Sequence, residues 1–258
     1  MMTETEIKEV ARLMGLRPYQ TEKRYIQALI LRSLYSRTNN ELIFKGGTAV
    51  FFAYGLKRFS EDLDFTENRE LDYDRLIKSV IEDLSRSGVN STVKRMSDNQ
   101  TGVSFRIGSE GPLFEKEIGR CYVAIDISKR ERPILPPVSM EIDTGYVEVP
   151  AINLLVMDKK EIMAEKVRAI ITRNKARDLY DLWFLLKMSE PCDIKLIESK
   201  LQHYKVAFDY KKFIESVERR SESWQRELSP LIIGGLDPFN AVLKDVKERT
   251  SVWRHYGT

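Results

Sequence analysis

The sequence is poor in the side chains that build disulfide frameworks and zinc sites. It has only two cysteines and two histidines among 258 residues. Cys121 and Cys192 lie far apart and form no Cys-x-x-Cys pattern, which is typical of reduced residues in a cytosolic protein. His203 and His255 are too few and too isolated for a histidine-rich zinc site.

Long apolar runs and a strong charge of either sign are missing as well. The longest apolar stretches are far shorter than a membrane span, and no signal-peptide pattern opens the chain, so we expect a cytoplasmic protein without a membrane partner. The 42 lysines and arginines outnumber the 39 aspartates and glutamates by three. That excess permits a nucleic-acid partner without requiring one.

The spacing of apolar residues predicts helices near both ends of the chain and a sheet between them. Helical spacing occurs in residues 4–37, 48–54, 72–87, 160–172, 177–188, 208–221 and 238–252. The alternation typical of strands occurs in residues 61–66, 91–96, 102–107 and 122–128. Prolines between residues 133 and 150 indicate a loop and an edge strand. We therefore expect an α/β (α+β) fold, with one domain in residues 1–150 and a helical lobe in residues 151–258.

A glycine pair opens the most informative stretch of the chain. It lies in Lys45-Gly46-Gly47-Thr48, at the start of the predicted helix 48–54, which Gly55 is expected to end. Glycines let backbone N–H groups approach a phosphate closely, and a helix N-terminus attracts anions. The stretch matches neither the Walker P-loop nor Gly-x-Gly-x-x-Gly, so kinase and Rossmann interpretations lose their main support. A tight turn without a ligand is the structural alternative.

Two aspartates follow on the next predicted strand, in Arg58-Phe59-Ser60-Glu61-Asp62-Leu63-Asp64-Phe65. With i, i+2 spacing, Asp62 and Asp64 point to the same face as Ser60, where carboxylates can share hard cations. A solvated strand face is the alternative, but strands are depleted in aspartate. The glycine pair and the two aspartates together are suited to the transfer of a nucleotide.

Three more charged residues lie in segments that are otherwise apolar. Asp126, on the polar face of the predicted strand 122–128, can serve as a third metal ligand or as a base. Lys166 falls in the middle of an apolar helix face, where its ammonium requires an anion such as a bound phosphate or must extend to water. Asp178 faces inward near the start of its helix, or it complements the helix dipole.

The remaining charged residues of the C-terminal lobe suggest simpler roles. Arg177 and Asp181 have the i, i+4 spacing of a surface ion pair, and the run Glu218-Arg219-Arg220 is typical of solvated surface. Arg173, Lys175 and Arg177 precede Asp178 as a basic cluster suited to phosphates.

Four motifs in this order resemble the AbiEii/AbiGii toxin family of nucleotidyltransferases, within the DNA polymerase β-type superfamily. They are Lys-Gly-Gly-Thr, Arg-Phe-Ser-x-Asp-Leu-Asp-Phe, Ala-Glu-Lys and Arg-x-Lys-Ala-Arg-Asp-Leu-Tyr-Asp-Leu, spread over residues 42–186. The resemblance implies a nucleotidyltransferase mixed-sheet core and a helical lobe that completes the active-site cleft. It also implies a type IV toxin, usually encoded beside an antitoxin, that adds nucleotides from an NTP to the 3′ end of an RNA, with transfer RNA favoured.

The resemblance also assigns roles to individual residues. Gly46, Gly47, Thr48 and Ser60 are expected to bind the nucleotide, and Lys166 to contact the triphosphate. Asp62 and Asp64 are expected to hold Mg²⁺ in a two-metal site, with Asp126 as the third carboxylate. Lys166 and Asp178 are the family's remaining essential pair. The expected catalytic residues are Asp62, Asp64, Asp126, Lys166 and Asp178.

Other functions use the same residue types and stay open at the level of sequence. A two-metal nuclease or a sugar transferase also uses an Asp-x-Asp pair, although a nuclease has no triphosphate for the glycines to bind. Nucleotidyl transfer to a protein or a small molecule needs the same nucleotide site. A nucleotide- or RNA-binding regulator that has lost turnover would keep the same fold.

Overall fold

The computed structural model describes residues 1–255, and their contacts divide the chain into two compact units. The sheet unit comprises Met1–Gly55, Phe59–Pro133 and Pro137–Met157. The helical unit comprises Leu56–Arg58, Ile134–Pro136 and the chain from Asp158 onward. The predicted domain boundary near residue 150 precedes a strand that lies in the sheet unit. Two short segments from earlier in the chain belong to the helical unit.

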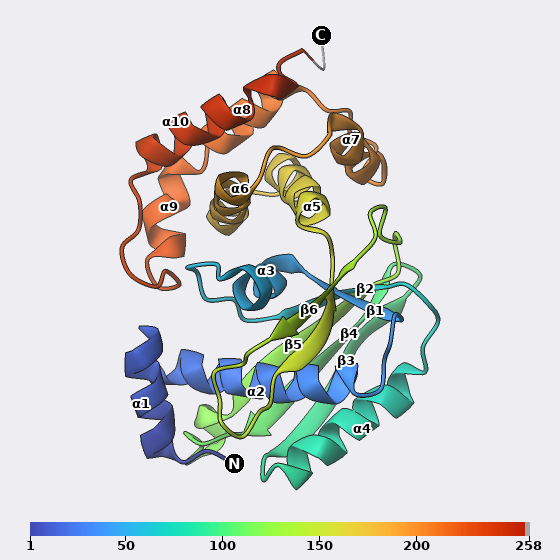
Figure 1. The fold of residues 1–258 in the computed structure, drawn as a ribbon, viewed down its shortest axis with the longest axis vertical. Coiled ribbons are helices and arrows are strands. Elements are labelled where there is room, and N and C mark those ends of the chain that lie inside the picture. Colours follow the sequence, from blue (N-terminus) through green and yellow to red (C-terminus); the bar gives the residue numbers. More distant parts are fainter. Residues whose placement is uncertain (256–258) are drawn as a thin grey trace. The chain divides into compact units, whose positions relative to one another are not determined.

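Seven strands of the sheet unit form one mixed sheet in the order β3-β4-β5-β2-β1-β7-β6 (Figure 1). The strands are β1 (Leu42–Lys45), β2 (Leu63–Glu67), β3 (Asn90–Asn99), β4 (Gly102–Glu110), β5 (Cys121–Ser128), β6 (Val138–Ile142) and β7 (Ile152–Val156). The central strand β2 runs antiparallel to β1 and parallel to β5. The mixed-sheet core is thus confirmed, and β6 is the expected edge strand. The sequence analysis missed β7.

Four helices belong to the sheet unit: α1 (Glu4–Met14), α2 (Pro18–Tyr35), α3 (Gly46–Tyr54) and α4 (Tyr73–Arg86), together with the short 3₁₀ turn Glu117–Gly119. The helical stretch predicted over residues 4–37 is two helices. Gly15 ends α1 in the left-handed conformation, with φ 66°. Pro18 then begins α2 at the first helical position, where its missing N–H breaks no helical hydrogen bond.

The core of the sheet unit lies between α2, α4 and one face of the sheet (Figure 1). Leu63 and Phe65 of β2 point into it and are fully buried, as is Ile125 of β5. Because side chains alternate along a strand, the residues between them face the other side of the sheet. Asp64 and Asp126 are therefore on the face opposite α2 and α4, and both are half-buried.

The described part of the helical unit contains α5 (Lys159–Thr172), α6 (Ala176–Met188), α7 (Ile194–Gln202), α8 (Tyr210–Glu218), α9 (Ser221–Leu228), α10 (Phe239–Arg249) and the 3₁₀ turn Ser251–Trp253. The predicted helices 160–172, 177–188 and 238–252 correspond to α5, α6 and α10. The predicted helix 208–221 corresponds to α8, which ends at Glu218, and no separate helix was predicted for α7 or α9. Within residues 1–255, every helix is too short or too polar to cross a membrane.

Candidate active site

The glycine pair forms the first turn of α3, directly after β1. Gly46 has a φ of 74°, a left-handed conformation that glycine adopts without steric cost. No side chain caps this end of the helix, where Lys45 is the N-cap residue. The leading N–H groups of a helix lack intrahelical acceptors, so the end of α3 can bind an anion. At the other end, Gly55 stops the helix in the left-handed conformation, as the sequence predicts.

The carboxylate of Asp64 packs directly against Gly46. Asp64 lies opposite Lys45 in the antiparallel pairing of β1 with β2. A Cβ atom added to Gly46 would lie 2.9 Å from both Cβ and Cγ of Asp64, and closer still to Oδ2. Glycine is therefore needed here for two reasons, the backbone conformation and the space that the carboxylate occupies. The N-terminus of α3 and Asp64 together define the candidate site of the sheet unit.

The loop that leads into β2 is fixed by side chains from two helices. The Thr48 hydroxyl, fully buried in α3, donates a hydrogen bond to the Asp62 carbonyl oxygen. Gln27 Nε2 donates to the carbonyl oxygens of Ser60 at 3.1 Å and Glu61 at 2.9 Å. Since β2 begins at Leu63, the predicted residues Ser60 and Asp62 lie in this loop and not on the strand. The hydroxyl of Thr48 therefore holds the loop that carries Asp62.

Asp126 lies next to Asp64 in the sheet. The two residues are partners in the parallel pairing of β2 with β5, so both side chains leave the same face. On the other side of β5, Ser104 of β4 is the register partner of Asp126, and its hydroxyl donates to Asp126 Oδ1 at 2.5 Å. The structure therefore places Asp126 beside Asp64, as its sequence position suggested, and adds Ser104 as its hydrogen-bond donor.

The donor set of this site fits Mg²⁺ when substrate phosphates are included. Among residues 1–255, no group of three or more His, Cys, Asp or Glu side chains forms a metal site by itself. Mg²⁺ usually keeps several waters and is held by one or two carboxylates together with substrate phosphates. Asp64, fixed against Gly46, and its neighbour Asp126 offer carboxylates of this kind beside an anion-binding helix end.

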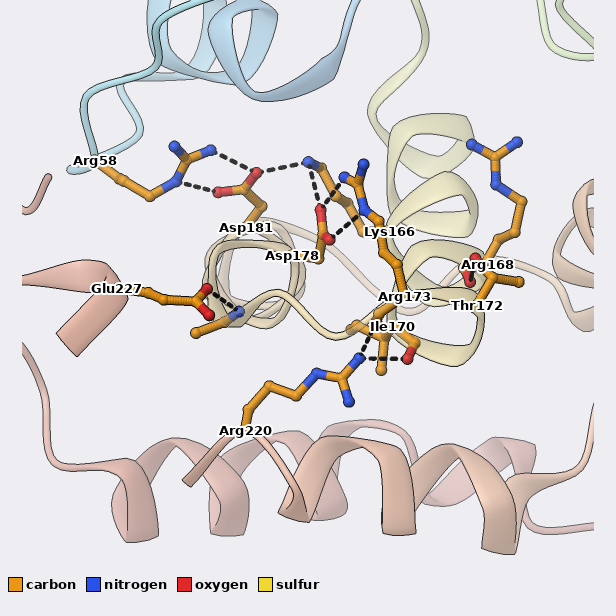
Figure 2. A network of polar contacts seen from close by, with 11 residues as sticks. Arg58, Lys166, Arg168, Ile170, Thr172, Arg173, Asp178, Asp181, Arg220 and Glu227 are labelled. Atoms are coloured by element: carbon orange, nitrogen blue, oxygen red, sulfur yellow. Dashed lines mark hydrogen bonds and ion pairs between the residues drawn. The ribbon is translucent and has the colours of Figure 1, made fainter. Parts of the chain in front are cut away.

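The helical unit contains a separate network of buried charges, drawn in Figure 2. Lys166 Nζ lies 2.7 Å from Asp181 Oδ2 and 3.4 Å from Asp178 Oδ1. Arg58 holds Asp181 with two hydrogen bonds of 2.9 Å, and Arg173 holds Asp178 with two of 2.8 and 2.7 Å. Both aspartates are fully buried, and Lys166 is 7% exposed. The network therefore alternates three cations with two carboxylates.

The pKa of each buried aspartate reflects these neighbours. Burial alone would raise the pKa of Asp178, but Lys166 and Arg173 lower it from 3.8 to about 2. For Asp181, burial again raises the pKa, and the charges of Arg58 and Lys166 outweigh it, so the pKa is lowered. Both carboxylates are thus ionised at neutral pH, and two of the three N–H donors of Lys166 face them.

Arg220 binds backbone carbonyl groups next to this network. Its guanidinium is 1% exposed and donates to the carbonyl oxygens of Ile170 and Arg173, and to that of Ser216. These bonds satisfy carbonyl groups at the C-terminal end of α5, beside the residue that holds Asp178. The expectation that Arg220 is a solvated surface residue is wrong.

Sequence reasoning also missed the buried roles of Arg58, Asp181 and Ser104. The alternative that Arg177 and Asp181 form a surface pair is wrong, because Asp181 is fully buried and bonded to Arg58 and Lys166. Asp181 lies three residues after Asp178 on α6, a spacing that places both on one helix face. That spacing is the signal that could have identified Asp181.

Substitution of Gly46 by alanine should lower kcat strongly, with little more loss of stability than a matched control. The new methyl group would displace Asp64, whereas alanine at Gly55 has the same left-handed strain, at φ 72°, with nothing within 4 Å. We expect both variants to lose about 1–2 kcal/mol of unfolding free energy. Only Gly46→Ala should lose more than about tenfold in kcat, since each 1.36 kcal/mol is tenfold. Equal activities of the two variants would show that the position of Asp64 against Gly46 does not matter for activity.

Acidification should destabilise the protein partly through Asp178. Because its folded pKa is lowered to about 2 from 3.8, its contribution is complete above pH 3.8 and is lost as the pH falls toward 2. Urea unfolding at a series of pH values below 5 should therefore show a weaker pH dependence for Asp178→Asn than for the unmodified protein. Identical pH dependences would show that Asp178 titrates as it does in the unfolded chain.

Comparisons with known proteins place the chain among nucleotidyltransferases. The family described as nucleotidyl transferase AbiEii toxin, type IV TA system, matches residues 29–245. An uncharacterized protein of Aquifex aeolicus (strain VF5) is 26% identical over 180 residues, which are 69% of this chain and 73% of that protein.

Two solved structures share the fold over nearly the whole chain. MenT4, a nucleotidyltransferase toxin from Mycobacterium tuberculosis H37Rv, is similar with a TM-score of 0.69 and 21% identity, over 96% of this chain and 88% of that one. The Helicobacter pylori protein JHP933 is similar with a TM-score of 0.59 and 18% identity, over 92% of both chains. At these identities the structural similarity shows the fold alone.

Proposed function

This chain belongs to the family of nucleotidyl transferase AbiEii toxins of type IV toxin–antitoxin systems, and on that premise we propose that it transfers a nucleotide from an NTP to the 3′ end of an RNA. The family makes the chain a nucleotidyltransferase and implies an NTP substrate and an antitoxin partner. The finer proposal is that the acceptor is transfer RNA, that the metal is Mg²⁺ and that the reaction takes place in the cytoplasm.

The observation that carries the proposal is the position of Asp64 against the first turn of α3. An anion-binding helix end and a metal-binding carboxylate meet at Gly46, and Asp126 adds a second carboxylate in register. A triphosphate with its metal requires both kinds of group at one place. A nuclease needs the carboxylates but not the helix end, so the arrangement favours nucleotidyl transfer.

Each residue of the sheet unit has a distinct role in the proposed mechanism. The backbone N–H groups of Gly46 and Gly47 would bind phosphate oxygens, and Ser60, in the loop before β2, would bind the nucleotide with them. Thr48 holds the backbone of the loop that presents Asp62. Asp62, Asp64 and Asp126 would hold Mg²⁺, which when bound polarises phosphoryl oxygens and lowers the pKa of an attacking hydroxyl.

We also propose a phosphate-binding role for Lys166. Its ammonium directs two N–H donors at Asp178 and Asp181, which leaves one donor for a ligand oxygen. Asp178, ionised and held by Arg173, would then be a positioning residue for Lys166. The two buried carboxylates fix the position of the ammonium, whose remaining N–H donor would bind a phosphate oxygen.

The proposed function is tested by labelling. Purified protein would be incubated with total transfer RNA, Mg²⁺ and each α-labelled NTP in turn, beside Asp62→Ala and Lys166→Ala, and the RNA separated on denaturing gels. Label in RNA with the unmodified protein alone would support the proposal and identify the base. Unlabelled RNA together with NTP-dependent pyrophosphate release would favour a protein or small-molecule acceptor. NTP-dependent thermal stabilisation without pyrophosphate release would favour a non-catalytic binder.

A further inference from the structure

The sheet unit has a cavity of about 410 Å³ at the carboxyl ends of β2 and β5. One wall comes from the segment that follows β2 and includes Arg69 and Tyr73, and the other from the segment that follows β5 and includes Lys129 and Arg132. Since β2 and β5 are parallel, their carboxyl ends lie at the same edge of the sheet. The same two strands carry Asp64 and Asp126 a few residues earlier.

Some of the charges that line this cavity already have partners. The Tyr73 hydroxyl donates to Glu67 at 2.5 Å. Lys129 Nζ lies 3.4 Å from Asp98 Oδ1 and 4.8 Å from the centroid of the Tyr73 ring. These contacts set the shape of the wall. Lys129 has an anionic partner, whereas the hydroxyl of Tyr73 brings no positive charge to Glu67.

Two arginines face the cavity without an anionic partner. Arg69 and Arg132 are exposed, and within residues 1–255 neither guanidinium forms an ion pair with a carboxylate. The lining contains three cationic side chains, Arg69, Lys129 and Arg132, and two carboxylates, Glu67 and Glu70, which is an excess of one positive charge. Guanidinium groups bind phosphate through paired hydrogen bonds, so the two arginines suit a ligand with more than one phosphate group.

Along β2 the helix end lies beside Asp64, and the cavity lies farther along, at the carboxyl end of the strand. Because β1 is antiparallel to β2, Lys45 pairs with Asp64 and Leu42 with Glu67. The turn that begins α3 follows Lys45 and is therefore at the Asp64 end of this pairing. The cavity begins at Glu67, three residues farther along β2, or about 10 Å at 3.3 Å per residue.

We propose that this cavity binds the phosphodiester backbone of the acceptor RNA near its 3′ end, with Arg69 and Arg132 contacting its phosphates. The inference rests on the proposed function. An in-line displacement places the leaving pyrophosphate and the attacking hydroxyl on opposite sides of the reacting phosphorus. With the triphosphate at α3, the acceptor strand enters from the side of the cavity. A stacked strand advances about 3.4 Å per nucleotide, so 10 Å corresponds to about three nucleotides.

The experiment compares two double variants of the full-length protein. Arg69→Ala/Arg132→Ala removes the two cavity charges, and Arg12→Ala/Lys116→Ala removes the same charge from exposed positions elsewhere on the sheet unit. The probe is a 5′-labelled single-stranded RNA of mixed sequence, and its Kd is measured by fluorescence anisotropy across a range of salt concentrations. Thermal shift with NTP and Mg²⁺, in the absence of RNA, reports the nucleotide site separately.

Loss of two phosphate contacts should make the slope of log K against log salt less steep by about 1.4. The cavity variant should therefore bind RNA about 25-fold more weakly than the unmodified protein at 0.1 M salt, and equally well at 1 M. The KM for RNA should rise while kcat and the NTP-dependent thermal shift stay unchanged. The inference is overturned if both double variants bind RNA within twofold of each other at 0.1 M salt, or if the cavity variant loses the NTP-dependent shift. If the unmodified protein labels no RNA, the proposed function fails, whatever the two variants show.

Discussion

Replacement of Asp64 by asparagine is expected to lower kcat for nucleotidyl transfer about a thousandfold and to leave the fold intact. Asparagine keeps the shape that packs against Gly46 and removes only the charge. A metal at such a site stabilises transition-state charge by several kcal/mol, and about 4 kcal/mol corresponds to a factor of about a thousand. The measurements are the rate of label transfer and the Mn²⁺-binding isotherm, which should both decrease.

The control for this substitution is on the same strand and the same face. Thr66 is fully buried two residues after Asp64, and its hydroxyl has no hydrogen-bond partner among the residues that the structure describes. Thr66→Val should therefore retain transfer and Mn²⁺ binding within a few-fold. If Asp64→Asn transfers nucleotides as fast as Thr66→Val, Asp64 holds no catalytic metal.

Among the single substitutions discussed, Asp181→Ala is expected to cause the largest loss of unfolding free energy. Asp181→Ala leaves Arg58, which is 2% exposed, and one side of Lys166 without a counter-charge. Breaking a buried ion pair by removing one partner costs about 3–5 kcal/mol, because an uncompensated charge stays buried. Urea unfolding, followed by circular dichroism, measures the change in unfolding free energy.

A double substitution separates the cost of the unpaired charge from that of lost packing. In Arg58→Met/Asp181→Leu, apolar side chains replace both partners, so no guanidinium remains buried alone. This variant should be more stable than Asp181→Ala by about 1 kcal/mol or more, since apolar replacements of buried pairs are often neutral. A loss below about 1 kcal/mol for Asp181→Ala alone would show that Arg58 finds another partner.

The sequence predicted those parts of the fold and site that depend on neighbouring residues. Local conformation explains the turn at Gly46 and the end of α3 at Gly55. The alternation of polar and apolar residues explains which face of β5 carries Asp126. Asp178 was expected to face inward, and it is fully buried. Each of these features is set by spacing within a few residues, which periodicity detects.

Features that depend on distant partners were not predicted. Arg58 and Asp181 are 123 residues apart, and only the folded chain shows that each neutralises the other in the interior. Arg220 was expected in water because charged runs usually are, yet it caps carbonyl groups 50 and 47 residues earlier. The short strand β7 begins two residues after Pro150, so its apolar residues were assigned to the proline-containing loop and not to a strand of their own.

The helical unit includes two segments from earlier in the chain, so it cannot be produced intact as a C-terminal fragment. Arg58 comes from the segment Leu56–Arg58, and the backbone N–H groups of Ile134 and Leu135 bind the buried carboxylate of Glu161. A gene fragment that encodes only the chain after Met157 lacks both segments, so Asp181 and Glu161 would each lose buried partners. A truncated protein that begins after Met157 is therefore expected to be less stable than the same helices in the full chain.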